Sequence, residues 1–174
     1  MNGFLRFFGL LNAAVWLGGA ISFTLAFGPA FFSNEMKAIL PPPYNGAAAQ
    51  IALHRYFILM SCCGALALVH FFLENLYLGK TIERLTFVIL LIVIGFGLIG
   101  GFWLQPKLKN LHLQKYSTSL SAETRTAADH SFKMWHGVSQ TMNLIAIGGL
   151  LVYFWRVSSA GNTSRFVNTQ KFRG

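Results

Sequence analysis

The sequence predicts an all-α integral membrane protein that folds as an antiparallel four-helix bundle. Of its 174 residues, 54% are hydrophobic and only 11% are charged, whereas roughly a quarter of the residues in soluble proteins are charged. Four apolar stretches use most of the chain, and about 20 apolar residues in a helix cross a bilayer. We expect one membrane domain, residues 1–157, with spans over residues 4–32, 50–78, 85–104 and 134–156, and a basic polar C-terminal tail, residues 158–174.

The charge distribution indicates a lipid partner. The formal net charge is +9, but the Lys and Arg residues gather at the ends of the apolar stretches and in the tail. This placement is typical of contact with anionic headgroups, so nucleic acid is not an expected partner. The basic residues divide equally between the two sides of the bundle. We expect both termini in the cytoplasm, because the short second turn is basic and the N-terminal amine adds a positive charge.

The first span begins with Arg6 and is closed by Pro29. Its length favours a retained helix over a cleaved signal peptide. Asn12 and Gly19 share one helix face, and Gly18 lies beside them. We expect Gly18 and Gly19 to let a neighbouring helix pack closely, with Asn12 as the one polar amide on this face.

The second span carries polar residues near both ends. His54 lies near its start, after an ordered loop that the prolines 41–43 predict, and His70 and Glu74 lie near its end at i and i+4. Arg6 and Asn12 come from the same side of the membrane, so we expect a second polar layer of Arg6, Asn12, His70 and Glu74. We favour a hydrogen-bonded layer, and a proton relay is the alternative.

The third span follows a turn so short that spans two and three should be antiparallel neighbours. Residues 95–100 match the letters of a dinucleotide-binding GxGxxG pattern, but no strand precedes them, so we reject that interpretation. Gly97 and Gly101 form a GxxxG spacing instead, which predicts close helix packing. We expect Pro106, after the interfacial Trp103, to end the helix.

The fourth span combines a membrane helix with a polar stripe. Ser121 is the expected N-cap of its helix, which starts about three turns before the membrane. His136, Ser139, Gln140 and Asn143 recur at i, i+3, i+4 and i+7, and this spacing places them on one helix face. Polar side chains in a bilayer usually face a protein interior, so we expect this stripe to point into the bundle as a ligand-binding face.

Antiparallel threading brings His54 and His136 to the same side of the membrane. Paired histidines from facing helices hold haem iron in four-helix bundles, and neutral imidazoles also ligate copper or zinc. Haem b and copper are therefore the candidate cofactors, and hydrogen-bonded interfacial anchors are the alternative interpretation of these histidines. The adjacent Cys62 and Cys63 could supply thiolates to copper(I), but in an apolar span they are more typical of core packing.

Three short patterns resemble a known family. They are Trp16-Leu-Gly-Gly19, Phe102-Trp-Leu-Gln-Pro106, and Phe132 with His136, Gly137, Ser139 and Asn143. In combination they resemble the transmembrane protein 205-like family, also catalogued as domain of unknown function 4149. The resemblance implies a four-helix membrane bundle in a bacterial inner (cytoplasmic) membrane. It also implies a distant kinship with copper-resistance D proteins and with haem-binding membrane proteins that oxidise protoporphyrinogen. No activity is established for the family, and His54 is not part of its pattern.

Three functions remain open from the sequence. The first is a non-catalytic membrane protein that binds or passes a small ligand, haem or a metal ion, on the inward polar face. The second is an accessory subunit of a larger membrane complex, which contacts partner subunits through the basic tail or the apolar helix faces. The third is a haem-dependent membrane oxidoreductase.

Overall fold

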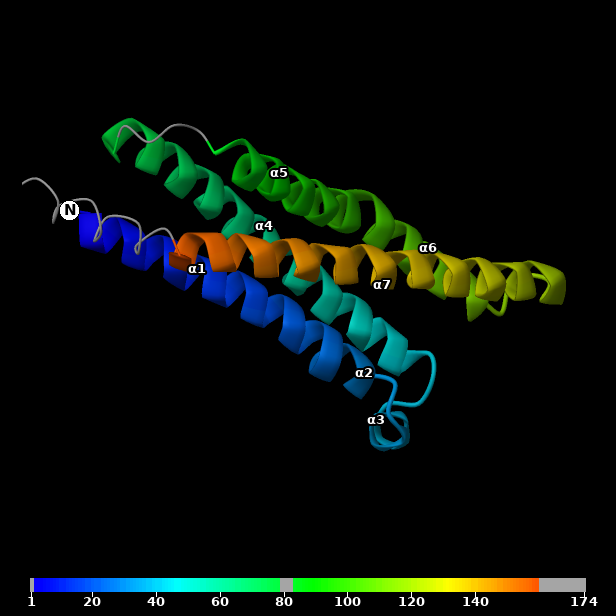
Figure 1. Cartoon of the computed structure of the whole chain (residues 1–174). Coiled ribbons are helices and arrows are strands. Elements are labelled where there is room, and N and C mark those ends of the chain that lie inside the picture. Colours follow the sequence, from blue (N-terminus) through cyan, green and yellow to red (C-terminus); the bar gives the residue numbers. More distant parts are fainter. Residues whose placement is uncertain (1, 79–82, 160–174) are drawn as a thin grey trace, which may run out of the picture.

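The computed structural model describes residues 2–78 and 83–159, and within these ranges the chain is helical with no strands. The described residues form four long helical units, arranged as in Figure 1. The π-helical segments η1 and η2 interrupt the first and the third of these units. In chain order the elements are α1 (Asn2–Ser22), η1 (Phe23–Phe27), α2 (Gly28–Ala30), α3 (Asn34–Ile39), α4 (Tyr44–Leu78), α5 (Arg84–Ile99), η2 (Gly100–Leu104), α6 (Gln105–Lys115) and α7 (Ala122–Ser159).

The four units form a ring. Helix α1 packs against α4 and α7, and α5 also packs against α4 and α7. The prediction of an all-α four-helix membrane bundle is thus confirmed. The core contains Trp16 and Tyr153, whose ring centroids lie 6.2 Å apart in an edge-to-face contact. This contact joins α1 to α7 at the half of the bundle near the N-terminus.

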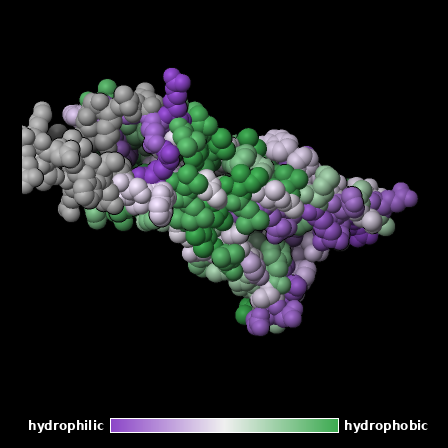
Figure 2. Space-filling model, viewed as in Figure 1, coloured by the Kyte–Doolittle hydropathy of each residue, from purple (hydrophilic) through white to green (hydrophobic). Residues whose placement is uncertain are grey.

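Each of the four units is long and apolar enough to cross a membrane. These candidate spans cover Gly3–Ala30, Tyr44–Tyr77, Arg84–Lys115 and Ala122–Ser159, and each overlaps one span expected from the sequence. In Figure 2, hydrophobic side chains cover the middle of the visible face, and hydrophilic ones gather at the α6–α7 tip and near α3. Large apolar side chains on the outer surface, such as Phe102 and Leu76, are each 80% exposed in the isolated chain. A surface of this kind fits a lipid bilayer.

Both π-helical segments end two residues before a proline. Proline donates no N–H, and its ring clashes with the carbonyl four residues earlier in an α-helix. Ahead of Pro29 and Pro106 the helix widens, and the N–H groups of Gly28 and Gln105 bond the carbonyls of Phe23 and Gly100, five residues back. The wider turn accommodates the proline, as is common for π-bulges. The prediction that Pro106 ends the third helix is therefore wrong, because the helix continues through α6 to Lys115.

The glycines expected at packing contacts divide into two pairs. A Cβ on Gly19 would lie 3.2 Å from Met60, and a Cβ on Gly101 would lie 3.2 Å from Phe57. At Gly18 and Gly97 a Cβ would meet no atom within 4 Å among the described residues. Close packing therefore occurs at Gly19 and Gly101, against α4, and does not occur at Gly18 and Gly97. The tightest approach on η2 is at Gly100, where a Cβ would lie 2.4 Å from the Phe57 ring.

The polar hairpin of α6 and α7 extends beyond the apolar belt. Ser121 caps α7 as predicted, since its Oγ accepts a hydrogen bond of 3.3 Å from the Thr124 N–H. Asp129 forms ion pairs with Lys115 on α6 and, at 2.7 Å, with Lys133 one turn along α7. These contacts fix the orientation of the N-terminal half of α7, and hence of the polar stripe that follows it.

Candidate functional site

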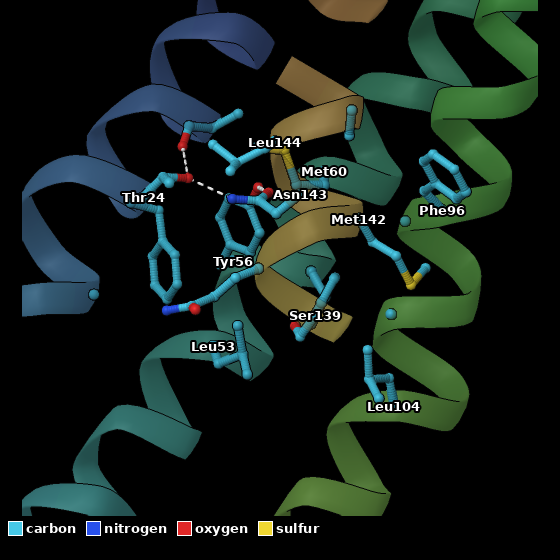
Figure 3. Close-up of a pocket in the computed structure, with 18 of the residues that line it drawn as sticks. Thr24, Leu53, Tyr56, Met60, Phe96, Leu104, Ser139, Met142, Asn143 and Leu144 are labelled. Carbon is cyan, nitrogen blue, oxygen red and sulfur yellow. Dashed lines mark hydrogen bonds between the residues drawn. The ribbon is translucent and has the colours of Figure 1, made fainter. Parts of the chain in front are cut away.

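A cavity of about 620 Å³ lies between the four helical units. It extends from the ends of α1 and α2 across the first half of α4 to the second half of α5 and the middle of α7 (Figure 3). Aromatic and aliphatic side chains form most of its wall. The polar residues that line it are Thr24, Gln50, Tyr56, Ser61, His136, Ser139, Gln140 and Asn143. Its volume is within the usual range for small-molecule sites.

All four residues of the predicted stripe, His136, Ser139, Gln140 and Asn143, line this cavity. The spacing of three and four residues along α7 keeps them on one face, and contacts of α7 with α1 and α5 turn that face inward. The stripe divides into two levels with different hydrogen bonding. Asn143 is the inner level, and the other three residues lie about one to two turns closer to the polar hairpin.

Asn143 belongs to a directed chain of hydrogen bonds. The Thr24 hydroxyl donates to the Ala20 carbonyl over 2.7 Å, so its oxygen accepts from Asn143 Nδ2, as Figure 3 shows. The Tyr56 hydroxyl donates to Asn143 Oδ1 over 2.8 Å. The chain links α4, α7 and η1 through the centre of the bundle. Because these bonds already occupy both ends of its amide, Asn143 serves mainly to hold the helices together.

The Tyr56–Asn143 bond also sets the register of α4 against α7. These helices run in the same direction, and the bond joins residues 87 positions apart. The same offset places Gln50 level with Gly137, next to His136. Gln50 and His136 both line the cavity. The outer level is therefore a polar layer built from two helices, and it contains Gln50, His136, Ser139 and Gln140.

The His136 side chain contacts its own helix and the turn that follows α2. Gln140 Nε2 donates to His136 Nε2 over 3.3 Å, so in the neutral ring the proton is on Nδ1. The imidazole stacks on Phe132, with ring centroids 5.8 Å apart and 7° between planes, and it meets the Phe32 ring edge-to-face at 6.3 Å. These aromatic contacts orient the imidazole at one end of the cavity.

His54 does not join His136. The register places it level with Thr141, about 7 Å farther along the bundle axis. It is exposed, and it is not one of the residues that line the cavity. The structure therefore does not bring the two histidines to one ligand, and the expectation of an axial histidine pair gains no geometric support.

The donor set fits haem and metal ions poorly. Among the described residues, no group of three or more His, Cys, Asp or Glu side chains is placed to hold a metal ion. His136 is the one imidazole of the cavity wall in the described ranges, and no Lys or Arg lines the cavity there to pair with haem propionates. Cys62 is exposed and Cys63 is buried, and neither lines the cavity.

The second polar layer is a set of separate bonds to backbone carbonyls. Asn12 Nδ2 donates to Cys63 O over 2.9 Å, His70 Nε2 donates to Leu5 O over 2.9 Å, and Arg6 donates to Ser158 O over 3.2 Å. Glu74 is partly buried one turn beyond His70. The bonds of Asn12 and His70 join α1 to α4. This arrangement favours a role in helix association over a proton relay.

Two tryptophans mark the level of the outer polar layer in the membrane. The rings of Trp103 and Trp135 lie 5.2 Å apart and nearly perpendicular, and the Lys107 ammonium lies 3.7 Å from the Trp135 ring centroid. Tryptophan with a basic residue is typical of the membrane–water interface. Trp135 precedes His136, so the outer polar layer lies near this interface.

Sequence reasoning missed Gln50, Thr24 and Tyr56. Gln50 is a polar residue at the start of a long apolar span, and its position was a usable signal. Thr24 and Tyr56 fit an apolar helix well enough that they give no such signal. Their role depends on helix register, which one sequence does not contain.

Comparison with known proteins adds a family but no activity. A family model described as Domain of unknown function (DUF4149) matches residues 11–117. No curated protein and no solved structure matches the chain. The matched range ends before α7, so the polar stripe lies outside it.

Proposed function

This chain belongs to the DUF4149 family, a family of unknown function, and we propose from its geometry that it binds a small, uncharged and largely apolar molecule inside the membrane. The observation that carries the proposal is the cavity of about 620 Å³. Close-packed protein interiors leave few voids larger than a water molecule. The cavity between the helices is partly open, and a space of this size can hold a small molecule. Its apolar wall sets the chemistry of that molecule.

The lining supports a neutral ligand. The cavity residues, all in the described ranges, include no Asp, Glu, Lys or Arg. Burial of an unpaired charge in such surroundings is very costly. A charged metabolite or a hydrated metal ion is therefore a poor fit, whereas a hydrophobic molecule with a small polar group matches the long apolar wall and the outer polar layer.

The other interpretations of the sequence, among them a haem-dependent membrane oxidoreductase, stay predictions. Haem binding has His136 as its candidate ligand, and the test below detects it directly. Partner subunits, the cytoplasmic position of the termini, the bacterial inner membrane and the kinship with copper-resistance D proteins are likewise untested. The tail that was expected to contact partners, from residue 160 on, lies outside the described residues.

The first test analyses what the native protein holds. We would extract the purified protein with organic solvent, identify the small molecules by mass spectrometry, and record oxidised and reduced absorption spectra with metal analysis. We expect a stoichiometric neutral hydrophobic molecule and no Soret band. A Soret band that shifts on reduction, or a stoichiometric metal, would overturn the proposal and restore a cofactor at His136.

A matched pair of variants locates the bound molecule. Ala146 lines the cavity, and its neighbour Ile145 is 54% exposed on the outer surface of α7. Ala146→Phe fills part of the cavity, so it should lower the amount of bound molecule several-fold. Ile145→Phe should leave it unchanged. Equal occupancy in both folded variants would show that the molecule binds elsewhere.

A further inference from the structure

We propose that the bound molecule carries a hydroxyl group, which the outer polar layer recognises through Gln50. This inference rests on the proposed function and narrows the ligand to an uncharged lipid alcohol. The hydroxyl donates its hydrogen to Gln50 Oε1 and accepts a hydrogen bond from a side chain of α7.

Gln50 provides the first observation. Its Oε1 is buried and has no hydrogen-bond partner among the described residues. A buried acceptor without a partner costs about 1–3 kcal/mol, so native proteins rarely contain one. Gln50 lines the cavity, and because the terminal torsion of glutamine is broad, rotation about it is the route by which this oxygen would meet a ligand there. The missing partner is a hydrogen-bond donor, because an amide oxygen only accepts.

The opposite wall provides the complementary groups. Register places His136 level with Gln50, and the bond from Gln140 leaves the neutral imidazole with its proton on Nδ1. The Ser139 hydroxyl lines the same cavity. Both groups can donate a hydrogen bond. The layer therefore offers an acceptor on α4 and donors on α7, and a hydroxyl group both donates and accepts hydrogen bonds.

This pattern separates a lipid alcohol from other neutral lipids. A ketone, an ester or a quinone only accepts, and it would leave Gln50 Oε1 unpaired. An alkane would leave both walls unpaired. A site built around a hydrogen-bonding group discriminates strongly against analogues that lack it.

The test compares two probes of nearly the same shape. Hexadecanol has a hydroxyl group, and 1-fluorohexadecane has a fluorine atom that cannot donate. Binding of each to the full chain, first stripped of its native ligand, would be measured by native mass spectrometry from detergent micelles. Gln50→Leu removes the acceptor, and Gln114→Leu, at an exposed position of α6, is the control.

We expect the wild type and Gln114→Leu to bind hexadecanol about five- to thirty-fold more tightly than the fluoride. In Gln50→Leu this preference should fall several-fold, because only the bond from α7 remains, while the fluoride still binds. Equal binding of both probes to the wild type would overturn the hydroxyl inference and leave the apolar site intact. A water molecule would then be the hydrogen-bond donor to Gln50 Oε1. If neither probe binds the wild type, the proposed function itself fails.

Discussion

Replacement of Asn143 by leucine tests whether the inner polar level holds the bundle together. The side chains are similar in size, so the substitution removes hydrogen bonds with little change in volume. Asn143 donates to Thr24 and accepts from Tyr56. Hydrogen bonds between membrane helices contribute about 0.6 kcal/mol on average and about 1.7 kcal/mol at most. For two bonds we expect a loss of about 1–3 kcal/mol in the free energy of unfolding.

A double-mutant cycle isolates the bond to Tyr56. Tyr56→Phe alone should lower the free energy of unfolding by about 0.6–1.7 kcal/mol. In the Asn143→Leu background it should cost nothing, because the hydroxyl has already lost its acceptor. The assay is reversible unfolding by dodecyl sulfate in mixed micelles, followed by circular dichroism. Ser139→Ala, one turn earlier on the same face, is the control and should change stability by less than about 0.5 kcal/mol. A coupling energy within about 0.3 kcal/mol of zero would refute the reasoning.

Three further predictions concern packing, the outer hairpin and topology. Gly100→Ala places a Cβ 2.4 Å from the Phe57 ring and should destabilise by about 1–3 kcal/mol. The Cβ of Gly97→Ala meets no atom within 4 Å, so this variant should be neutral or more stable by up to about 1 kcal/mol. The same unfolding assay compares the two variants. A lower stability of Gly97→Ala than of Gly100→Ala would contradict the packing described at η2. Asp129→Asn removes the ion pairs with Lys115 and Lys133, so amide hydrogen exchange in α6 should become faster. The free energy of unfolding should fall by at most about 1 kcal/mol at low salt. Unchanged exchange would show that these pairs do not fix the hairpin. The topology is tested by a single cysteine at Ser119, with Cys62 and Cys63 replaced by alanine. If the termini are cytoplasmic, this cysteine should react with a membrane-impermeant maleimide in intact cells. Labelling only after lysis would place the termini outside.

The sequence alone was sufficient to predict four membrane helices and to predict which residues of α7 share one face. Apolar length fixes a membrane helix, and helical periodicity fixes which residues of one helix share a face. The relations between helices were not accessible in this way. His54 and His136 enter from the same side, yet the register set by Tyr56 and Asn143 separates them along the axis.

The prolines show that helix ends are also difficult to predict from a single sequence. A proline in a helical pattern normally predicts a helix end. The turn before each of Pro29 and Pro106 widens, but the helix ends at Ala30 in the first case and extends to Lys115 in the second. Gly100 helps here, because the Phe57 ring lies where a side chain would have to fit. The outcome thus depends on a neighbouring helix.

The tryptophan pair at the outer layer has a consequence for how a ligand reaches the cavity. Trp103 and Trp135 are typical of headgroup depth, and Asn143 lies seven residues beyond His136, about 10 Å farther along the helix from that interface. An amphiphile bound with its polar group at Gln50 and His136 would have the same up–down orientation as the lipids of the leaflet opposite the termini. It could exchange with that leaflet by lateral movement alone, and its polar group would never have to cross the hydrocarbon interior.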